Sequence, residues 1–152
     1  MSAPSRILAI DPGKARLGLA ISDTDRRIAS PLTTWTRRDR ARDGQYLRQV
    51  IADEQIGLIV IGLPVHLDGR EGVQARIARE FGVWVAALTG LPCVFWDERF
   101  TTREAESQLW DAGLTHKQRK ARRDRVAAQI LLQAYLDAGC PAERTVGPLD
   151  EK

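Results

Sequence analysis

Three acidic residues lie where their carboxylates could meet, and their positions suggest metal chemistry. Asp11 directly follows the apolar run 6–10, and Glu98 closely follows the apolar run 93–96. Functional groups of a parallel sheet gather beyond the carboxyl ends of its strands, so these two acids are expected to project toward one place. Asp124 shares one face of a helical segment with apolar residues, so it is expected to point toward the sheet.

Convergent carboxylates need a counter-charge. Without a cation the three acids would repel one another, and at least one would have to stay protonated. With a divalent ion they form a hard, all-oxygen site suited to Mg²⁺ or Mn²⁺. Two such ions about 3.5–4 Å apart can activate a water and stabilise the leaving oxygen of a phosphodiester. Two simpler interpretations stay open: Asp11 only accepts backbone N–H bonds in its Asp-Pro-Gly turn, or Asp124 pairs with Arg122 or Arg125.

The elements that must position these acids predict a mixed α/β sheet flanked by helices. Strands are expected at 6–10, 17–22, 28–35, 57–62 and 93–96, and helices after 43–44, from 73 to 88, from 101 to 113 and from 115 to about 138. Short polar connections favour three antiparallel strands first, and intervening helices then favour two parallel ones. T-x-x-E and T-x-x-Q capping boxes begin the last two helices. The sum is five strands in one mixed sheet.

Length and composition narrow the class of protein. The 152 residues fit a single domain, 1–152, in which 142–152 is expected to be a flexible polar tail. No stretch approaches the roughly 20 apolar residues of a membrane span, so no membrane partner is expected. Two cysteines without metal-ligand spacing, and the lack of a secretory signal pattern, favour a cytoplasmic protein. No segment marks a dimer surface, so a monomer and a homodimer both stay open.

Positive charge is concentrated in two segments, although the net charge is only +3. The segment 117–125 holds six basic residues and one acid, and the segment 36–42 holds four arginines. Such clusters on a nearly balanced chain predict a surface that binds a polyanion. The alternative is a solvated helix face.

Four motifs are similar to those of the YqgF/RuvX nuclease family, in the family's order, between about residues 6 and 137. They are Ile10-Asp-Pro-Gly13 with Arg16 and Gly18-Leu-Ala20 through Asp23, Gly62-Leu-Pro64 with Asp68-Gly69, Asp97-Glu-Arg99 with Thr101-Thr102, and Asp124 with Ala127-Ala128 and Ile130-Leu131. The resemblance implies an RNase H-like fold and a divalent-metal nuclease site with two Mg²⁺ or Mn²⁺ ions. Its catalytic residues and metal ligands would be Asp11, Glu98 and Asp124.

The resemblance also implies a nucleic-acid substrate. The implied role is maturation of the 5′ end of pre-16S rRNA, with Holliday junction resolution as the alternative activity. Departures from the family pattern are Lys14 and Ala15 in place of Thr and Lys, and His66 in place of Asn. They affect loop polarity and substrate contact, not the three acids. The residues assigned to nucleic-acid contact are Lys14, Arg16, Arg99, Lys117, Arg119, Lys120, Arg122, Arg123 and Arg125.

Two other classes of function compete with a nuclease. A nucleic-acid-binding module without chemistry would use the 117–125 segment, with salt-sensitive binding and no metal-dependent cleavage. An actin-like or sugar-kinase-type phosphotransferase also places D-x-G after a strand. That architecture needs two related domains and a second phosphate loop, for which a 152-residue chain without repeats lacks room.

Overall fold

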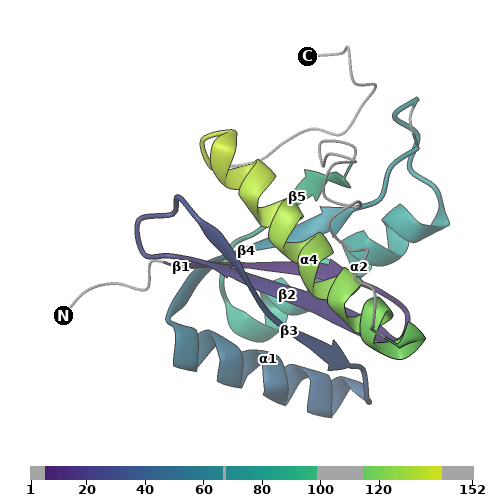
Figure 1. Cartoon of the computed structure of the whole chain (residues 1–152), viewed down its shortest axis with the longest axis horizontal. Coiled ribbons are helices and arrows are strands. Elements are labelled where there is room, and N and C mark those ends of the chain that lie inside the picture. The colour runs from purple at the N-terminus through teal and green to yellow at the C-terminus, as the bar shows by residue number, and fades with distance from the viewer. Residues whose placement is uncertain (1–5, 67, 99–114, 142–152) are drawn as a thin grey trace.

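The protein is built on a five-stranded mixed sheet with helices on both faces (Figure 1). The computed structural model describes residues 6–66, 68–98 and 115–141, without the side chains of His116 and of 119–123. The elements are β1 (Arg6–Pro12), β2 (Arg16–Ser22), β3 (Ala29–Thr36), α1 (Arg40–Glu54), β4 (Ile56–Leu63), α2 (Val73–Thr89), β5 (Cys93–Asp97) and α4 (His116–Asp137).

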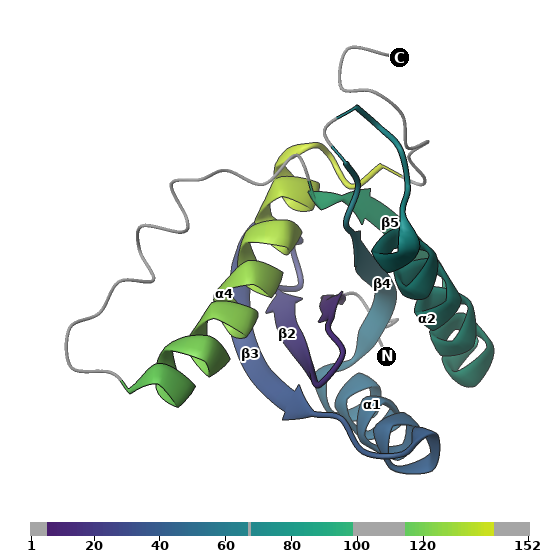
Figure 2. The ribbon, with the colours of Figure 1, turned by 90° about the vertical axis from the view of Figure 1, so that its right-hand side faces the viewer.

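The order of strands across the sheet is β3-β2-β1-β4-β5. The first three strands pair antiparallel, whereas β4 runs parallel to β1 and β5 runs parallel to β4. This arrangement confirms the sheet expected from the sequence, with a meander followed by two crossovers. The carboxyl ends of β1, β4 and β5 therefore lie at one edge of the sheet, and Figure 2 is viewed from that edge.

Two cores form because successive side chains of a strand point to opposite faces. Ile7 and Ala9 of β1 pack on the face that α4 covers, with buried residues such as Leu131 and Tyr135. Leu8 of β1 belongs to the other core, which lies under α1 and α2. Figure 2 shows α4 on one side of the strands and α1 with α2 on the other. Alternation along each strand thus fixes which residues can face α4.

The structure corrects the expected start of the first helix. A start after Asp43-Gly44 was expected, but α1 begins at Arg40, because Asp39 caps it by accepting a hydrogen bond from the Arg42 backbone N–H. Gly44 lies inside the helix, where an added Cβ would come within 3.2 Å of a Leu88 methyl group. The glycine therefore serves close packing of α1 on α2 and does not end a loop.

The last described helix begins as its capping box predicts. The Thr115 hydroxyl accepts from the Gln118 backbone N–H, and the Gln118 side chain accepts from the Thr115 N–H. Of the other expectations, the helix at 101–113 and the tail at 142–152 lie outside the described residues. Within the described ranges, no helix combines the length and apolar character needed to cross a bilayer.

Candidate active site

Strand alternation places three polar side chains on the α4 face, near the edge of the sheet at which β1, β4 and β5 end. Asp11 follows Ala9 by two residues and therefore shares its face, and Glu98 follows the buried Trp96 in the same way. Arg16 begins β2 and lies on the face of Ala20, which also belongs to the core under α4. The ends of the strands therefore set where these side chains lie along the sheet, and the pleat sets which face they share.

Asp11 and Glu98 contact each other through a side-chain hydrogen bond. Burial raises the pKa of both carboxyls, and burial together with the neighbouring Asp11 charge raises the pKa of Glu98 to about 9. The hydrogen bond lowers the pKa of Asp11, whereas the charge of Asp124 raises it further. Glu98 is therefore the protonated donor and Asp11 the acceptor. The two acids therefore share one proton, which removes the repulsion between two charged carboxylates.

Gly62 makes room for this contact. β4 lies between β1 and β5, so the Glu98 side chain has to cross β4 to reach Asp11. A Cβ added to Gly62 would lie 2.5 Å from Oε2 of Glu98 and 3.2 Å from a methyl carbon of Leu131. Any larger residue at this position would push the carboxyl away, so Gly62 belongs to the architecture of the site.

Asp124 is engaged by Arg16. The Nε atom of Arg16 donates to Oδ2 of Asp124 at 2.6 Å, and each side chain is 26% exposed. A Cβ added to Gly18 would overlap the backbone carbonyl of Asp124, so α4 lies directly against β2 at this point. Asp124 therefore points toward the sheet, where Arg16 of β2 is its partner among the described side chains.

Two of the three acids, Asp11 and Glu98, contact each other, and Asp124 lies beside this pair. Among the residues that the structure describes, no three acidic, histidine or cysteine side chains stand together as a ready metal-binding group. Asp124 is close enough to raise the pKa of Asp11, but its carboxylate is turned to Arg16. The donor set still fits Mg²⁺ or Mn²⁺, because carboxylate oxygens are the ligands these ions prefer.

The structure describes the side chains of only some of the remaining candidate residues. Lys14 is exposed in the turn between β1 and β2, Lys117 is exposed in the first turn of α4, and Arg125 is half-buried next to Asp124. Four others lie on the described backbone of α4, but their side chains lie outside the description: Arg119, Lys120, Arg122 and Arg123. Arg99 lies outside the described residues altogether.

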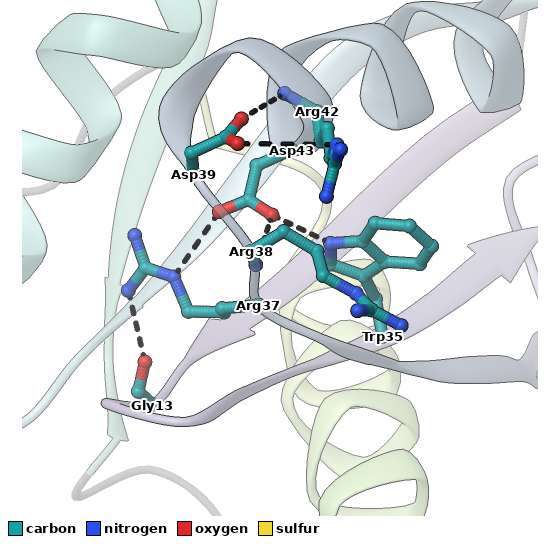
Figure 3. A network of polar contacts seen from close by, with 7 residues as sticks. All are labelled: Gly13, Trp35, Arg37, Arg38, Asp39, Arg42 and Asp43. Atoms are coloured by element: carbon teal, nitrogen blue, oxygen red, sulfur yellow. Dashed lines mark hydrogen bonds and ion pairs between the residues drawn. The ribbon is translucent and has the colours of Figure 1, made fainter.

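A polar network centred on the buried Asp43 holds the turn that follows Asp11 (Figure 3). Asp43 is 2% exposed and its Oδ1 accepts from the Trp35 indole N–H and from the Arg38 backbone N–H, both at 2.8 Å. Its Oδ2 lies 3.6 Å from Nε of Arg37. Arg37 in turn donates from Nη1 to the Gly13 carbonyl at 3.0 Å. The network thereby ties the start of α1 to the loop beside the acids.

Asp43→Asn is expected to lower the free energy of unfolding by about 1.5–3 kcal/mol, the range for a hydrogen bond to a charged group. An amide can still accept from Trp35, but it leaves the Arg37 guanidinium without its carboxylate. Urea unfolding measures the loss. Asp39→Asn is the matched control, because Asn caps a helix as well as Asp and should change stability by less than about 0.5 kcal/mol. Equal effects of the two substitutions would contradict the anchoring role of Asp43.

The sequence did not reveal three features of the site. The first is the pairing of Arg16 with Asp124, since Arg16 was assigned to nucleic-acid contact. The second is Gly62 as the space for Glu98, and the third is the clamp of Arg37 on the turn. One signal was available for the first. Small residues at positions 18 and 20 of β2 indicate a closely packed helix on the face that Arg16 shares.

Comparisons with known proteins agree in family and in fold. The model of the RuvX family, described as Holliday junction resolvase, matches residues 5–138. A Rhodopirellula baltica protein is 40% identical over 136 residues, covering 90% of this chain and 79% of its own length. A Rhodobacter capsulatus protein is 42% identical over 131 residues, covering 86% of this chain and 82% of its own length. Both carry the name "Putative pre-16S rRNA nuclease".

A solved structure shares the fold at low sequence identity. Thermus thermophilus RuvC in complex with a Holliday junction substrate matches with a TM-score of 0.55 and 14% identity, covering 95% of this chain and 99% of that one. This likeness supports the RNase H-like architecture expected from the motifs. With a family model that matches nearly the whole chain and relatives at about 40% identity, the protein belongs to the RuvX family.

Proposed function

We propose that the protein is a divalent-metal-dependent endonuclease that hydrolyses phosphodiester bonds in structured nucleic acid. The observation that carries this proposal is the contact between the half-buried side chains of Asp11 and Glu98 at the carboxyl ends of β1 and β5, with Asp124 beside them on α4. The pKa of both carboxyls is raised by desolvation, that of Glu98 to about 9, and such perturbed acids cluster at functional sites. Membership of a family whose members carry nuclease names supports the same conclusion.

The residues divide the work in a simple way. Asp11, Glu98 and Asp124 would hold Mg²⁺ or Mn²⁺, with Asp11 at the centre between the other two. When bound, such ions activate the attacking water and stabilise the leaving oxygen of the phosphodiester. Gly62 keeps the Glu98 side chain within reach of Asp11, and the Arg37 clamp fixes the turn after Asp11. The protein thereby holds Glu98 beside Asp11, whereas the carboxylate of Asp124 is turned to Arg16.

The substrate we favour is the 5′ end of pre-16S rRNA. Relatives at about 40% identity carry pre-16S rRNA in their name and match most of this chain, and the family motifs imply action at its 5′ end. A four-way DNA junction is the second candidate, favoured by the description of the family model and by the fold shared with RuvC. Action on an rRNA precursor would place the protein in the cytoplasm. A resolvase would need two active sites and hence a homodimer, whereas an rRNA nuclease could act as a monomer.

A direct comparison of substrates tests this proposal. The purified chain is incubated with an rRNA precursor and with a four-way DNA junction, each with Mg²⁺, with Mn²⁺ and with EDTA, at one salt concentration. We expect cleavage of the precursor that depends on the metal. Faster cleavage of the junction would make the protein a resolvase. Salt-sensitive binding without cleavage of either would instead support a binding module without chemistry.

The second basic segment contributes to the proposed nucleic-acid interface. Thr36 pairs with Arg16 across β2 and β3, and the Arg37 N–H donates to the Ala15 carbonyl, so this segment begins next to the turn that carries Lys14. The side chains of Arg38, just before α1, and of Arg42, in its first turn, are exposed. The α4 segment and this one therefore lie on opposite faces of the sheet, near the edge with the acids (Figure 2). Phosphates on both sides of the cleavage point would find a basic partner.

Replacing Arg38 and Arg42 together by Gln is expected to flatten the salt dependence of duplex binding. The slope of log K against log salt should fall by about 1.8, because each lost phosphate contact removes about 0.9. Binding is measured with EDTA present, so cleavage does not interfere. The matched control replaces the exposed Arg27 and Arg48 by Gln, which removes the same net charge away from the edge. An equal change of slope in both variants would show that net charge alone matters.

A further inference from the structure

The ion pair between Arg16 and Asp124 occupies a carboxylate that the proposed metal site needs. Nε of Arg16 and Oδ2 of Asp124 are 2.6 Å apart, the geometry of a charge-assisted hydrogen bond. Both side chains are about three-quarters buried, so the pair is screened less than a surface salt bridge. Arg16 also lies close to the acid pair along the sheet, because Asp11 is the register partner of Gly18, two residues further on.

Backbone packing holds the two partners at this distance. Gly18 lets α4 approach β2 until the Asp124 backbone touches the strand. Arg16 is fixed in register by Thr36 of β3, and it points to the same face as Gly18. The guanidinium therefore reaches Asp124 without any displacement of the helix. A cation held by Asp11 and Glu98 would have to share this carboxylate with the guanidinium.

We propose that Arg16 and the divalent metal compete for Asp124, so that Arg16 is a positioning residue that lowers metal affinity in the absence of substrate. A guanidinium beside the carboxylate takes one oxygen and adds a positive charge that repels the incoming cation. A phosphate is the natural alternative partner for a guanidinium, which binds it in a planar, bidentate manner. A bound nucleic acid would therefore draw Arg16 from Asp124 and favour metal binding. This inference rests on the proposed function, because it requires the metal site.

Calorimetric titration of the full chain with Mn²⁺ alone, without nucleic acid, tests the competition. Arg16→Gln is expected to bind Mn²⁺ about fivefold more tightly, the upper range for a partly exposed ion pair. Arg125→Gln removes the same charge from the residue next to Asp124 and should change affinity less, because adjacent residues of a helix do not face each other. Equal effects of Arg16→Gln and Arg125→Gln, or weaker binding by Arg16→Gln, would overturn the inference.

A double-mutant cycle separates direct competition from general electrostatics. In an Asp124→Asn background, Arg16→Gln should no longer tighten Mn²⁺ binding, since the shared carboxylate is gone. A gain of the same size in both backgrounds would overturn the inference and leave the nuclease proposal intact. Absence of Mn²⁺ binding to every variant would overturn the proposed function and the inference together.

A measurement on the unmodified chain guards against variants that fold poorly. The Nε–H resonance of Arg16 is followed by NMR while diamagnetic Mg²⁺ is added without nucleic acid. Loss of the hydrogen bond to Asp124 should move this resonance toward the position of a solvent-exposed arginine. An Arg16 resonance that stays in place at saturating Mg²⁺ would show that the ion pair survives metal binding, which contradicts the competition.

Discussion

Asp11→Asn is expected to reduce metal-dependent cleavage by at least about 10²–10³-fold, the cost of removing one electrostatic stabiliser from an active site. Asp11 is the acid that both other acids influence, through the hydrogen bond from Glu98 and the charge of Asp124. The amide has the same shape but carries no charge, so it binds a hard cation poorly. The measurement is the single-turnover rate on the substrate that the wild-type chain cleaves.

The fold of this variant should be intact or slightly more stable. Burial disfavours the charged form of Asp11, and a neutral amide removes that penalty while still hydrogen bonding to Glu98. Thermal unfolding without metal checks this. Asp25→Asn is the matched control, because Asp25 is exposed in the polar turn between β2 and β3. This variant should cleave the substrate at the wild-type rate. Wild-type activity in Asp11→Asn would remove this residue from the catalytic site.

Metal affinity is expected to rise with pH by about tenfold per unit between roughly pH 6 and 8, since one proton must leave for each metal bound. The pKa of Glu98 is raised to about 9 by burial and by the charge of Asp11, so Glu98 holds its proton throughout this range. Calorimetric titration with Mg²⁺ at constant ionic strength gives the slope. In Glu98→Gln no such proton exists, so affinity should be weaker and nearly independent of pH. A wild-type affinity that is flat over this range would contradict the shared proton.

The stability of the metal-free protein should change in the opposite direction. The folded-state pKa of Glu98 lies at about 9, above the ordinary value of 4.5, so the folded chain binds this proton more tightly than the unfolded chain. The resulting stability is fully present below about pH 4.5 and is lost as the pH rises through about 9. The raised pKa of Asp11 acts in the same sense. Urea midpoints without metal should therefore fall with pH, and saturating Mg²⁺ should oppose the fall.

Much of the fold was predictable because it depends on local patterns. Apolar runs and short polar turns identify the five strands, and the capping box at Thr115 fixes the start of the last helix. The boundary of α1 was predicted wrongly, because a glycine that serves helix packing has the same appearance in a sequence as one that ends a loop. Only the close approach of the Leu88 side chain to Gly44 shows that this glycine serves helix packing.

In the candidate site, too, local patterns were predictable and contacts between distant segments were not. The sequence by itself determined that Asp11 and Glu98 close parallel strands, because hydrophobic runs reveal strand ends and parallel strands end at one edge. Only the tertiary structure decided that Glu98 shares a proton with Asp11 across Gly62, and that Asp124 pairs with Arg16, 108 residues away. Burial and charge pairing depend on which segments pack together, and no local pattern records that. The sequence thus supplied the acids, and packing decided that Asp124 faces a guanidinium while Asp11 and Glu98 face each other.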